Sequence, residues 1–298
     1  MIAFLRARPV VAGLIGASII AFSAILVELA DVSPETAAVF RCVYAVPVLG
    51  VLAWREDRRF GPRPWRQRRL GLLAGAFFAA DLIFWHHAIE DVGAGLATVL
   101  GNLQVVLVAF LAWMLLAERP AGRMFVAVPA ALLGAVMISG LLEQGAFGSD
   151  PGRGTVFGVL TTIAYSGFIL VLRASNANPD RPAGPLLDAT AAAAVVAIAA
   201  SATYGAADLV PSWPAHGWLG LLALSSQVVG WLLISISLPR LPAAVTSLIL
   251  LVQPVSSVAL AAVILGEIPS GLQIGGVVLI LFVVVYATTE RRPPVATP

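Results

Sequence analysis

Long apolar segments alternate with short polar ones along the whole chain, and Gly, Pro or charged residues bound each apolar segment. A helix rises 1.5 Å per residue, so segments of roughly 20 residues can cross a hydrocarbon layer of ~30 Å. Lipid offers the backbone no hydrogen-bond partners, and the pattern lacks the alternating strands of a membrane barrel. We therefore predict an all-α membrane protein with ten transmembrane helices, over residues 10–29, 35–54, 70–89, 93–117, 124–142, 154–172, 185–204, 217–238, 242–265 and 270–288.

The composition agrees with this pattern. Of 298 residues, 59% are hydrophobic and 11% are charged, whereas soluble domains carry about 25% charged residues. All 18 basic residues are Arg, they lie mainly in short loops, and the net charge is only +2. This distribution disfavours a nucleic-acid partner. The single cysteine, Cys42, forms no internal disulfide.

The arginines also predict the orientation. If the amino terminus is cytoplasmic, 16 of the 18 arginines fall on the cytoplasmic side, only Arg153 falls outside, and Arg41 lies within the second span. Such asymmetry follows the positive-inside rule. We expect a multi-pass protein of the inner (plasma) membrane with both termini in the cytoplasm. The first apolar segment is predicted to be a retained span rather than a signal peptide.

The chain contains an internal repeat at an offset of 149 residues. Residues 70–120 and 219–269 share 13 identities in 51 positions without a gap, and the matches include Glu118 with Glu267. Each copy holds five predicted spans, an odd number, so the second copy enters the membrane from the opposite side. Inverted repeats of this kind recur among secondary transporters because the two halves can exchange inward-open and outward-open shapes.

Several short motifs resemble one known family. These motifs are Thr36-Ala37-Ala38-Val39-Phe40-Arg41, Leu115-Leu116-Ala117-Glu118-Arg119-Pro120, Leu265-Gly266-Glu267-Ile268-Pro269 and Gln253-Pro254. With ten predicted helices in two copies, the chain resembles the EamA-type transporters of the drug/metabolite transporter superfamily. The resemblance implies EamA-like repeats over 1–142 and 154–288, followed by a cytoplasmic tail, 289–298. It also implies a metabolite transporter, often an exporter of amino acids or related compounds.

Five polar residues are predicted near the bilayer centre, where transporters bind their solutes. Counting 1.5 Å per residue places them roughly 14–17 Å from a membrane face. They are Asp81, Asn102, Gln104, Gln227 and Gln253. Gln104 and Gln253 occupy equivalent positions in the two copies, and their amides suit a zwitterionic or amide-bearing solute. The alternative is that they hydrogen-bond neighbouring helices.

Asp81 is the strongest indication of a specific role, because placing a carboxylate at this depth in the membrane costs about 2.5–3.5 kcal/mol. Arg41 lies at a similar depth, so we expect the two to form an ion pair, which is either structural or part of a proton- or substrate-coupled switch. Trp85 follows Asp81 by one helical turn, and Gln227 and Trp231 repeat this polar-plus-aromatic spacing. Both tryptophans are candidates for the wall of a solute pocket.

The remaining candidates are weaker. Tyr165 is a further candidate for the cavity lining. Pro254 removes a backbone donor beside Gln253 and frees a carbonyl within the membrane. Glu118 and Glu267 end their helices at opposite membrane faces, where the helix dipole disfavours a carboxylate, so each needs a partner. We assign Pro254 and both glutamates a gating or structural role.

These observations favour a secondary transporter of a small molecule, with Asp81 as the candidate site for a coupling proton. The chain has no phosphate-binding loop, no nucleophile motif and no metal-binding motif. We therefore expect no catalytic residues, cofactor or metal, and no enzyme. The alternatives are a non-transporting membrane sensor or scaffold and, less favoured, an intramembrane enzyme. A packed centre without a cavity would favour the scaffold.

Overall fold

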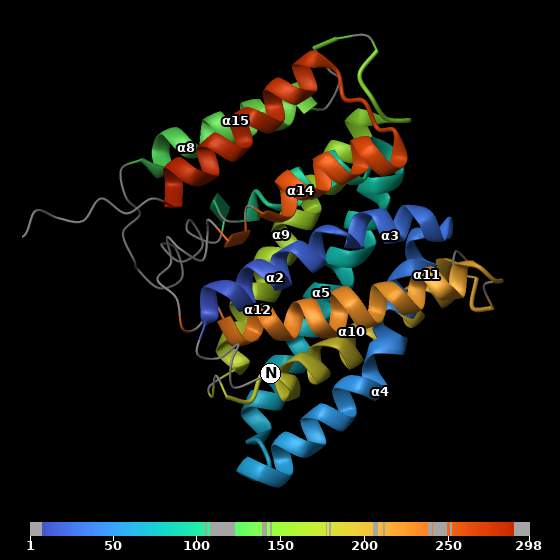
Figure 1. Ribbon diagram of the computed structural model, residues 1–298, viewed down its shortest axis with the longest axis vertical. Helices are drawn as coiled ribbons and strands as arrows, with labels where there is room; N and C mark the ends of the chain where they lie inside the picture. The colour runs from blue at the N-terminus through green and yellow to red at the C-terminus, as the bar shows by residue number, and fades with distance from the viewer. Residues whose placement is uncertain are drawn as a thin grey trace, which may run out of the picture.

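The computed structural model describes residues 8–104, 106–107, 123–138, 142–143, 145–176, 178, 180–204, 208–210, 212–237, 240, 249–250 and 252–288. Every element with assigned bounds in these residues is a helix (Figure 1). The α-helices are α2 (Pro9–Ala21), α3 (Ser23–Ala30), α4 (Pro34–Phe60), α5 (Trp65–Val92), α6 (Ala94–Gly101), α8 (Met124–Ile138), α9 (Pro151–Ser175), α10 (Ala183–Tyr204), α11 (Ala215–Leu222), α12 (Trp231–Ser237), α14 (Val252–Leu260) and α15 (Gly271–Thr288). Within the described residues, the π-helical segments Ala223–Gly230 and Ala261–Leu265 continue α11 and α14.

Local sequence explains where several helices begin and end. The side chain of Ser33 accepts the backbone N–H of Thr36, and Pro34 occupies the first position of α4, where a missing N–H costs nothing. Asp150 and Pro151 start α9 in the same way. Gly61 ends α4 with a φ of 79°, which glycine adopts readily.

In the part of the chain that the structure describes, six helical stretches are long and apolar enough to cross a membrane: Pro9–Ala30, Pro34–Phe60, Trp65–Val92, Pro151–Ser175, Ala183–Ala202 and Ala215–Ser237. Three shorter apolar helices accompany them, Pro129–Ile138, Val252–Leu265 and Gly271–Tyr286. Large apolar side chains such as Val126, Val195 and Phe282 are 60–67% exposed, as expected where lipid is the solvent. The predicted spans 93–117 and 242–265 lie partly outside the described residues, so the count of ten remains a prediction.

Three pairs of helices from corresponding spans of the two repeats pack against each other and run antiparallel. At one end of the α4–α10 pair, the Glu56 carboxylate accepts the backbone N–H of Ala183, at 3.0 Å. At the other end, the N–H of Asp208 donates to Thr36, at 2.9 Å. The carboxyl end of each helix therefore meets the amino end of its counterpart.

The same arrangement recurs twice more. In the α6–α14 pair, Thr98 contacts Ser257, and one turn before it Ala94 meets Glu267, so the residue numbers run in opposite directions. In the α8–α15 pair, Gln273 near the start of α15 donates to the carbonyl of Ile138 at the end of α8. Figure 1 shows the α8–α15 pair at one end of the molecule and the α4–α10 pair at the other.

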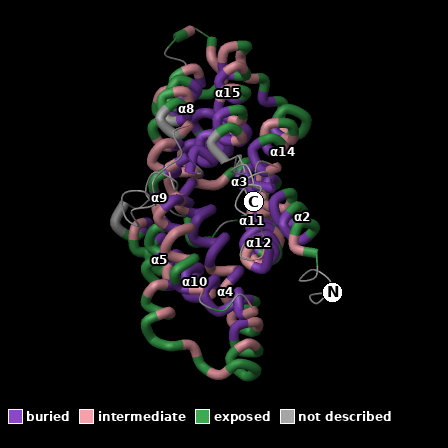
Figure 2. The backbone as a smooth tube through the Cα atoms, turned by 90° about the vertical axis from the view of Figure 1, so that its left-hand side faces the viewer, coloured by how far each residue is buried: buried purple, intermediate pink, exposed green. Residues whose placement is uncertain are grey.

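Buried positions line the faces that the helices turn toward one another, and exposed positions cover the outward faces (Figure 2). Small residues allow close contact between the repeats. A Cβ atom added at Gly75 of α5 would lie 2.4 Å from the carbonyl oxygen of Ala189 and 2.5 Å from the Cβ of Ala192, both on α10. Backbone must therefore move to admit even one methyl group.

Gly75→Ala should lower the apparent melting temperature of the purified protein by several degrees, since overpacking costs about 1–3 kcal/mol. Gly50→Ala is the matched control, because a Cβ atom there meets nothing within 4 Å. Thermal unfolding of both variants in one detergent measures the difference. Equal melting temperatures would show that the α5–α10 contact is looser than described.

Candidate functional site

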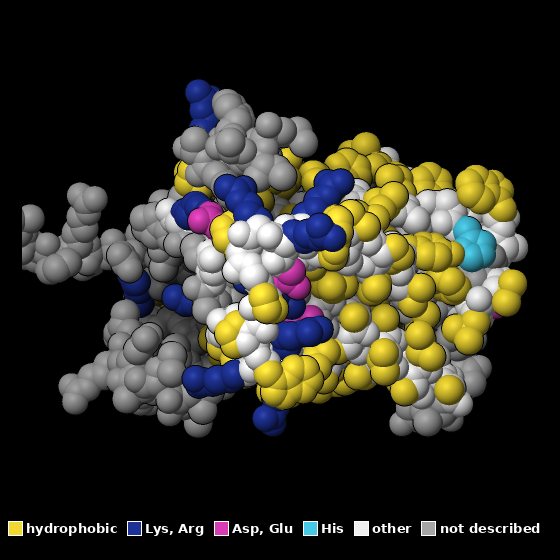
Figure 3. Space-filling model, turned by 90° about the horizontal axis from the view of Figure 1, so that it is seen from below, with side chains coloured by type: hydrophobic (Ala, Val, Ile, Leu, Met, Phe, Trp, Pro, Cys, Tyr) yellow, Lys and Arg dark blue, Asp and Glu magenta, His cyan; other side chains and the backbone are white. Residues whose placement is uncertain are grey.

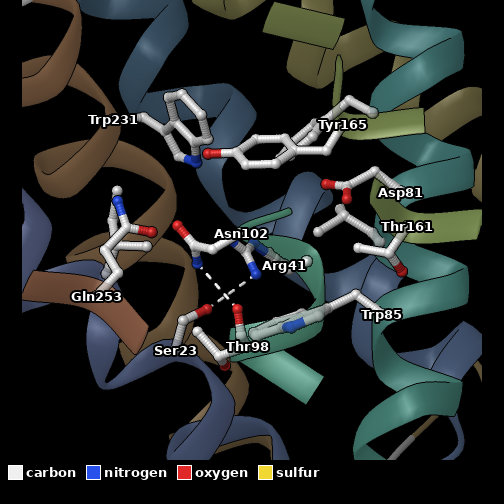
Figure 4. Close-up of a pocket in the computed structure, with 14 residues that line it drawn as sticks. Ser23, Arg41, Asp81, Trp85, Thr98, Asn102, Thr161, Tyr165, Trp231 and Gln253 are labelled. Atoms are coloured by element: carbon white, nitrogen blue, oxygen red, sulfur yellow. Dashed lines mark hydrogen bonds between the residues drawn. The ribbon is translucent and has the colours of Figure 1, made fainter. Parts of the chain in front are cut away.

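A cavity with charged and polar residues in a largely apolar lining, which we call the central cavity, lies between helices of the two repeats (Figure 4). Its volume is about 60 Å³, well below the ~300–1,000 Å³ of a typical ligand pocket. Helices of both repeats contribute to its walls. The lining residues are Ile20, Ser23, Arg41, Phe78, Asp81, Leu82, Trp85, Thr98, Gly101, Asn102, Thr161, Tyr165, Trp231 and Gln253.

Helix irregularities surround this cavity. The first span is interrupted at Phe22, between α2 and α3, and Ser23 directly follows. Helix α6 ends at Gly101, and Asn102 donates its side-chain N–H to the carbonyl of Thr98, at 2.9 Å. The eighth predicted span is π-helical from Ala223 to Gly230. Such π-bulges and broken helices are frequent at functional sites and at the solute sites of transporters.

Arg41 is the fixed centre of the site, with a side chain that neighbouring helices hold in place. Its Nε donates to Oε1 of Gln227 at 3.0 Å, and its Nη1 donates to the hydroxyl of Ser23 at 2.9 Å. Gln227 in turn donates to Thr190, at 3.0 Å. Both acceptors of Arg41 are uncharged, so neither neutralises a guanidinium that is only 3% exposed. A buried charge in this setting calls for an anionic partner.

The ion pair expected between Arg41 and Asp81 is not formed. Among the described residues, Asp81 has no hydrogen bond or ion pair, although it is only 7% exposed and lines the same cavity. The reason is geometric, because the guanidinium turns two of its N–H groups toward Ser23 on α3 and Gln227 on the π-helical segment. The two charges remain within electrostatic range of each other but face the cavity separately.

Aromatic rings line the cavity on more than one side, and Phe168 packs behind them (Figure 4). Phe78 stacks on Phe168 with centroids 4.5 Å apart, and Trp231 meets Phe168 edge-on at 5.1 Å. The Arg41 guanidinium carbon lies 5.8 Å from the ring centroid of Trp85 and 5.9 Å from that of Phe78, close enough for cation–π attraction. These rings give the cavity apolar surface, and the faces of the rings attract positive charge.

Two further polar groups in the lining lack partners. Neither the indole Nε1 of Trp231 nor the hydroxyl of Thr161 has a hydrogen-bond partner within the described residues, and both are buried. Buried polar groups are nearly always satisfied in native proteins, so unsatisfied ones beside a cavity need an explanation. Figure 4 shows Trp231 and Tyr165 together on one side of the cavity, with Asp81 and Gln253 on opposite sides.

Seven residues predicted from the sequence line this cavity: Arg41, Asp81, Trp85, Asn102, Tyr165, Trp231 and Gln253. Gln227 lies behind Arg41 and orients it. Gln104 is buried but is not among the lining residues, although its counterpart Gln253 is. Pro254 is buried in α14 next to Gln253, and Glu118 lies outside the described residues.

The sequence pattern did not indicate Ser23, Phe78, Thr98 or Thr161 as cavity residues. Threonine and serine are common in apolar helices, where they bond their own backbone, so their types carry no signal. Phe78 is apolar, like most residues of a membrane helix, so its type does not indicate a cavity. For Phe78 one signal was available, since it precedes Asp81 by three positions on the same helix and shares its face.

Glu267 lies away from this cavity and contacts the other repeat. Its Oε1 accepts the N–H of Ala94 at 2.7 Å, and its Oε2 accepts the N–H of Gly95 at 3.1 Å. These are the first two residues of α6, where backbone N–H groups lack helical partners and the dipole favours a negative charge. Burial raises the pKa of Glu267, and the two N–H groups act in the opposite direction.

Glu267 also borders a second cavity of about 340 Å³. This cavity shares no lining residue with the central one. Its lining residues are Glu28, Ile89, Glu90, Gly93, Phe147, Gly148, Ser149, Leu265 and Glu267. The contact between Glu267 and α6 therefore lies at the edge of this second cavity, beside the ends of α3 and α5. We call this edge the rim.

The helices define an integral membrane protein in which two helical repeats enclose a charged, aromatic-lined cavity. The EamA-like transporter family matches the chain twice, over residues 7–140 and 152–289, and the chain belongs to this family of membrane transporters within the drug/metabolite transporter superfamily. A small-molecule substrate follows at the level of the family.

A solved structure described only as the crystal structure of a protein is similar over 95% of this chain and 98% of its own, with 17% identity and a TM-score of 0.62. This similarity supports the fold alone. None of the curated proteins matches the sequence.

Proposed function

We propose that the protein is a secondary transporter that carries a small zwitterionic metabolite, such as an amino acid or a related compound, through the central cavity. The observation that carries this proposal is that Arg41 and Asp81 line one cavity and that neither has a partner of opposite charge within the described residues. A zwitterion supplies both missing partners, its carboxylate for Arg41 and its ammonium group for Asp81. The indole N–H of Trp231 adds a second donor, and the aromatic rings offer surface for a side chain.

The size of the cavity supports a transport cycle. About 60 Å³ holds little more than ordered water, so binding a metabolite requires the surrounding helices to separate. Helices interrupted beside the cavity and small residues between the repeats permit such movement. Alternating access then exposes the site to one membrane face at a time.

We further propose ten spans in two inverted five-helix repeats, 1–142 and 154–288, with residues 289–298 as a cytoplasmic tail. The antiparallel packing of α4 with α10, α6 with α14 and α8 with α15 supports the inversion. The arginine distribution supports an inner-membrane protein with both termini in the cytoplasm. Export is the direction that the family resemblance favours.

Asp81 is the residue we propose for proton coupling. It is the carboxylate that lines the central cavity, and no other group in the described part of the chain is bonded to it. A carboxylate in this setting exchanges a proton for a solute ammonium group at little structural cost. A membrane proton gradient can then drive the solute against its own gradient.

Flux in proteoliposomes tests the proposed function. Wild-type protein should move at least one amino acid or related zwitterion from a broad panel, faster under an imposed pH gradient. Asp81→Asn should slow this flux at least about tenfold and abolish the response to pH, because the amide neither binds ammonium nor exchanges a proton. Asp31→Asn, at an exposed carboxylate, is the matched control.

Folded wild-type protein that moves no solute from the panel would exclude transport of this class. Flux that Asp81→Asn and Asp31→Asn leave equally intact would exclude Asp81 from the site while retaining transport.

A further inference from the structure

The α4–α5 hairpin carries an outward stripe that changes character along its length. On α4, Val48, Val51, Arg55 and Arg58 recur at intervals of three or four residues, so they share one face of the helix. All four are exposed. Trp54, 55% exposed, lies beside the point where apolar residues give way to arginine.

Helix α5 carries the same kinds of residue from the connection inward, with its tryptophan outermost. Trp65 is 64% exposed, Arg66 and Arg69 follow, and Leu73 and Phe77 continue the same face. The short connection between Phe60 and Trp65 brings the two arginine-bearing ends to the same level. Figure 3 shows arginines gathered at one end of this face of the molecule, with apolar side chains beyond them.

The arginines of these stripes have no acidic partner in the described part of the chain, because the nearby carboxylates are already engaged. Glu56 accepts the N–H groups of Ala183 and Gly184, at 3.0 and 2.9 Å. Asp57 pairs with Arg181. The buried pair Arg63–Asp188, at 2.7 Å, uses the third carboxylate. Arg55, Arg58, Arg66 and Arg69 are thus left exposed and unpaired.

Aromatic rings hold part of this charge at the surface. The Arg58 guanidinium carbon lies 4.6 Å from the ring centroid of Trp54, and that of Arg59 lies 5.2 Å from the ring centroid of Phe60. Stacking of this kind orders a guanidinium while leaving its edge N–H groups free. Those groups match the two free oxygens of a phosphodiester, which arginine binds in bidentate fashion.

We propose that the α4–α5 hairpin is a binding site for an anionic phospholipid, such as phosphatidylglycerol. The phosphate lies against the arginines of the two stripes, and the acyl chains lie along Val48, Val51, Leu73 and Phe77. On both helices the apolar residues lie farther from the connection than the arginines, which matches the order of acyl chain and headgroup in a lipid leaflet, and Trp54 and Trp65 lie close to the arginines. This inference does not depend on the transported solute.

Titration of the purified full chain with phosphatidylglycerol and with phosphatidylcholine in mixed micelles tests the proposal. Native mass spectrometry of bound lipid and thermal stabilisation provide the two readouts. Phosphatidylglycerol should bind more tightly, and Arg58→Gln should weaken its binding about fivefold. Arg173→Gln removes one exposed arginine at the end of α9 and is the matched control, expected to change nothing.

Both substitutions lie at the surface, so neither should affect folding. Equal affinity for the two lipids would overturn the proposal. Equal weakening by Arg58→Gln and Arg173→Gln would also overturn it, because it would show attraction to overall charge rather than a site on the hairpin.

Discussion

Arg41→Gln is expected to lower the affinity of the central cavity for a zwitterionic solute about 100-fold, in the lower part of the range for removing one partner of a buried charge pair. Ser23 and Gln227 hold Arg41 in place, so in the proposed site its remaining N–H groups meet the solute carboxylate with little loss of entropy. A neutral amide offers weaker hydrogen bonds and no charge. Substrate-dependent thermal stabilisation and flux measure the change.

Substrate analogues separate this role from a structural one. Arg41→Gln should lose its preference for an amino acid over the corresponding decarboxylated amine, whereas Asp81→Asn should lose its preference over the deaminated acid. If Arg41 only holds helices together, the substitution should weaken amino acid and amine equally. That result would remove Arg41 from the recognition of the carboxylate.

Much of the architecture could be predicted because lipid imposes strict rules on sequence. Apolar length predicts where helices lie, and the predicted span 35–54 falls within α4 just as 154–172 falls within α9. The internal offset of 149 residues predicts which helices correspond. Residues far apart in sequence can also be predicted to lie together, because a polar residue at mid-membrane has to face the interior. Asp81, Asn102 and Gln253 all line one cavity.

Depth alone could not predict which partner each polar group takes. Arg41 and Asp81 lie at similar depths on neighbouring spans, yet Arg41 bonds Gln227, which is 186 residues away in the sequence. Which partner a side chain meets depends on the rotation of its helix about the helix axis. The π-helical segment around Gln227 changes the direction in which the side chains of this helix point. Nothing in the apolar pattern of residues 217–238 indicates such a segment.

Residues that match between the two repeats also do not always occupy equivalent places in the cavity. Gln104 and Gln253 match at the constant offset, but only Gln253 lines the cavity. Arg41 and Asp81 both come from the first repeat, whereas Trp231 and Tyr165 come from the second. A solute with different ends needs an asymmetric site, so divergence between the copies is expected where the solute binds.

Glu267→Ala should open the rim beside the second cavity. The carboxylate joins the repeats by accepting the N–H groups of Ala94 and Gly95, and hydrogen bonds to a charged group contribute about 1.5–3 kcal/mol each. Alanine leaves both N–H groups without an acceptor. The equilibrium should shift at least about tenfold toward the form in which this rim is open and the central cavity is exposed on that side.

Cysteine labelling measures the shift. The only native cysteine, Cys42, is buried and is replaced by serine, and Thr161→Cys in the cavity lining supplies the reporter. Labelling by a membrane-impermeant maleimide added on the side of Glu267 should be about tenfold faster in Glu267→Ala. Glu90→Ala, which removes an exposed carboxylate from the lining of the same cavity, should leave the rate unchanged.

Gly93→Ala approaches the same contact from the other repeat. Gly93 has a φ of 89°, and a Cβ atom there would lie 2.8 Å from Oε2 of Glu267 and 2.8 Å from the ring of Phe147. The added methyl group therefore pushes the carboxylate away from α6 without removing it, and it should also accelerate labelling. If neither variant exceeds the Glu90→Ala rate, the contact does not restrain the rim, and Glu267 serves only to cap α6.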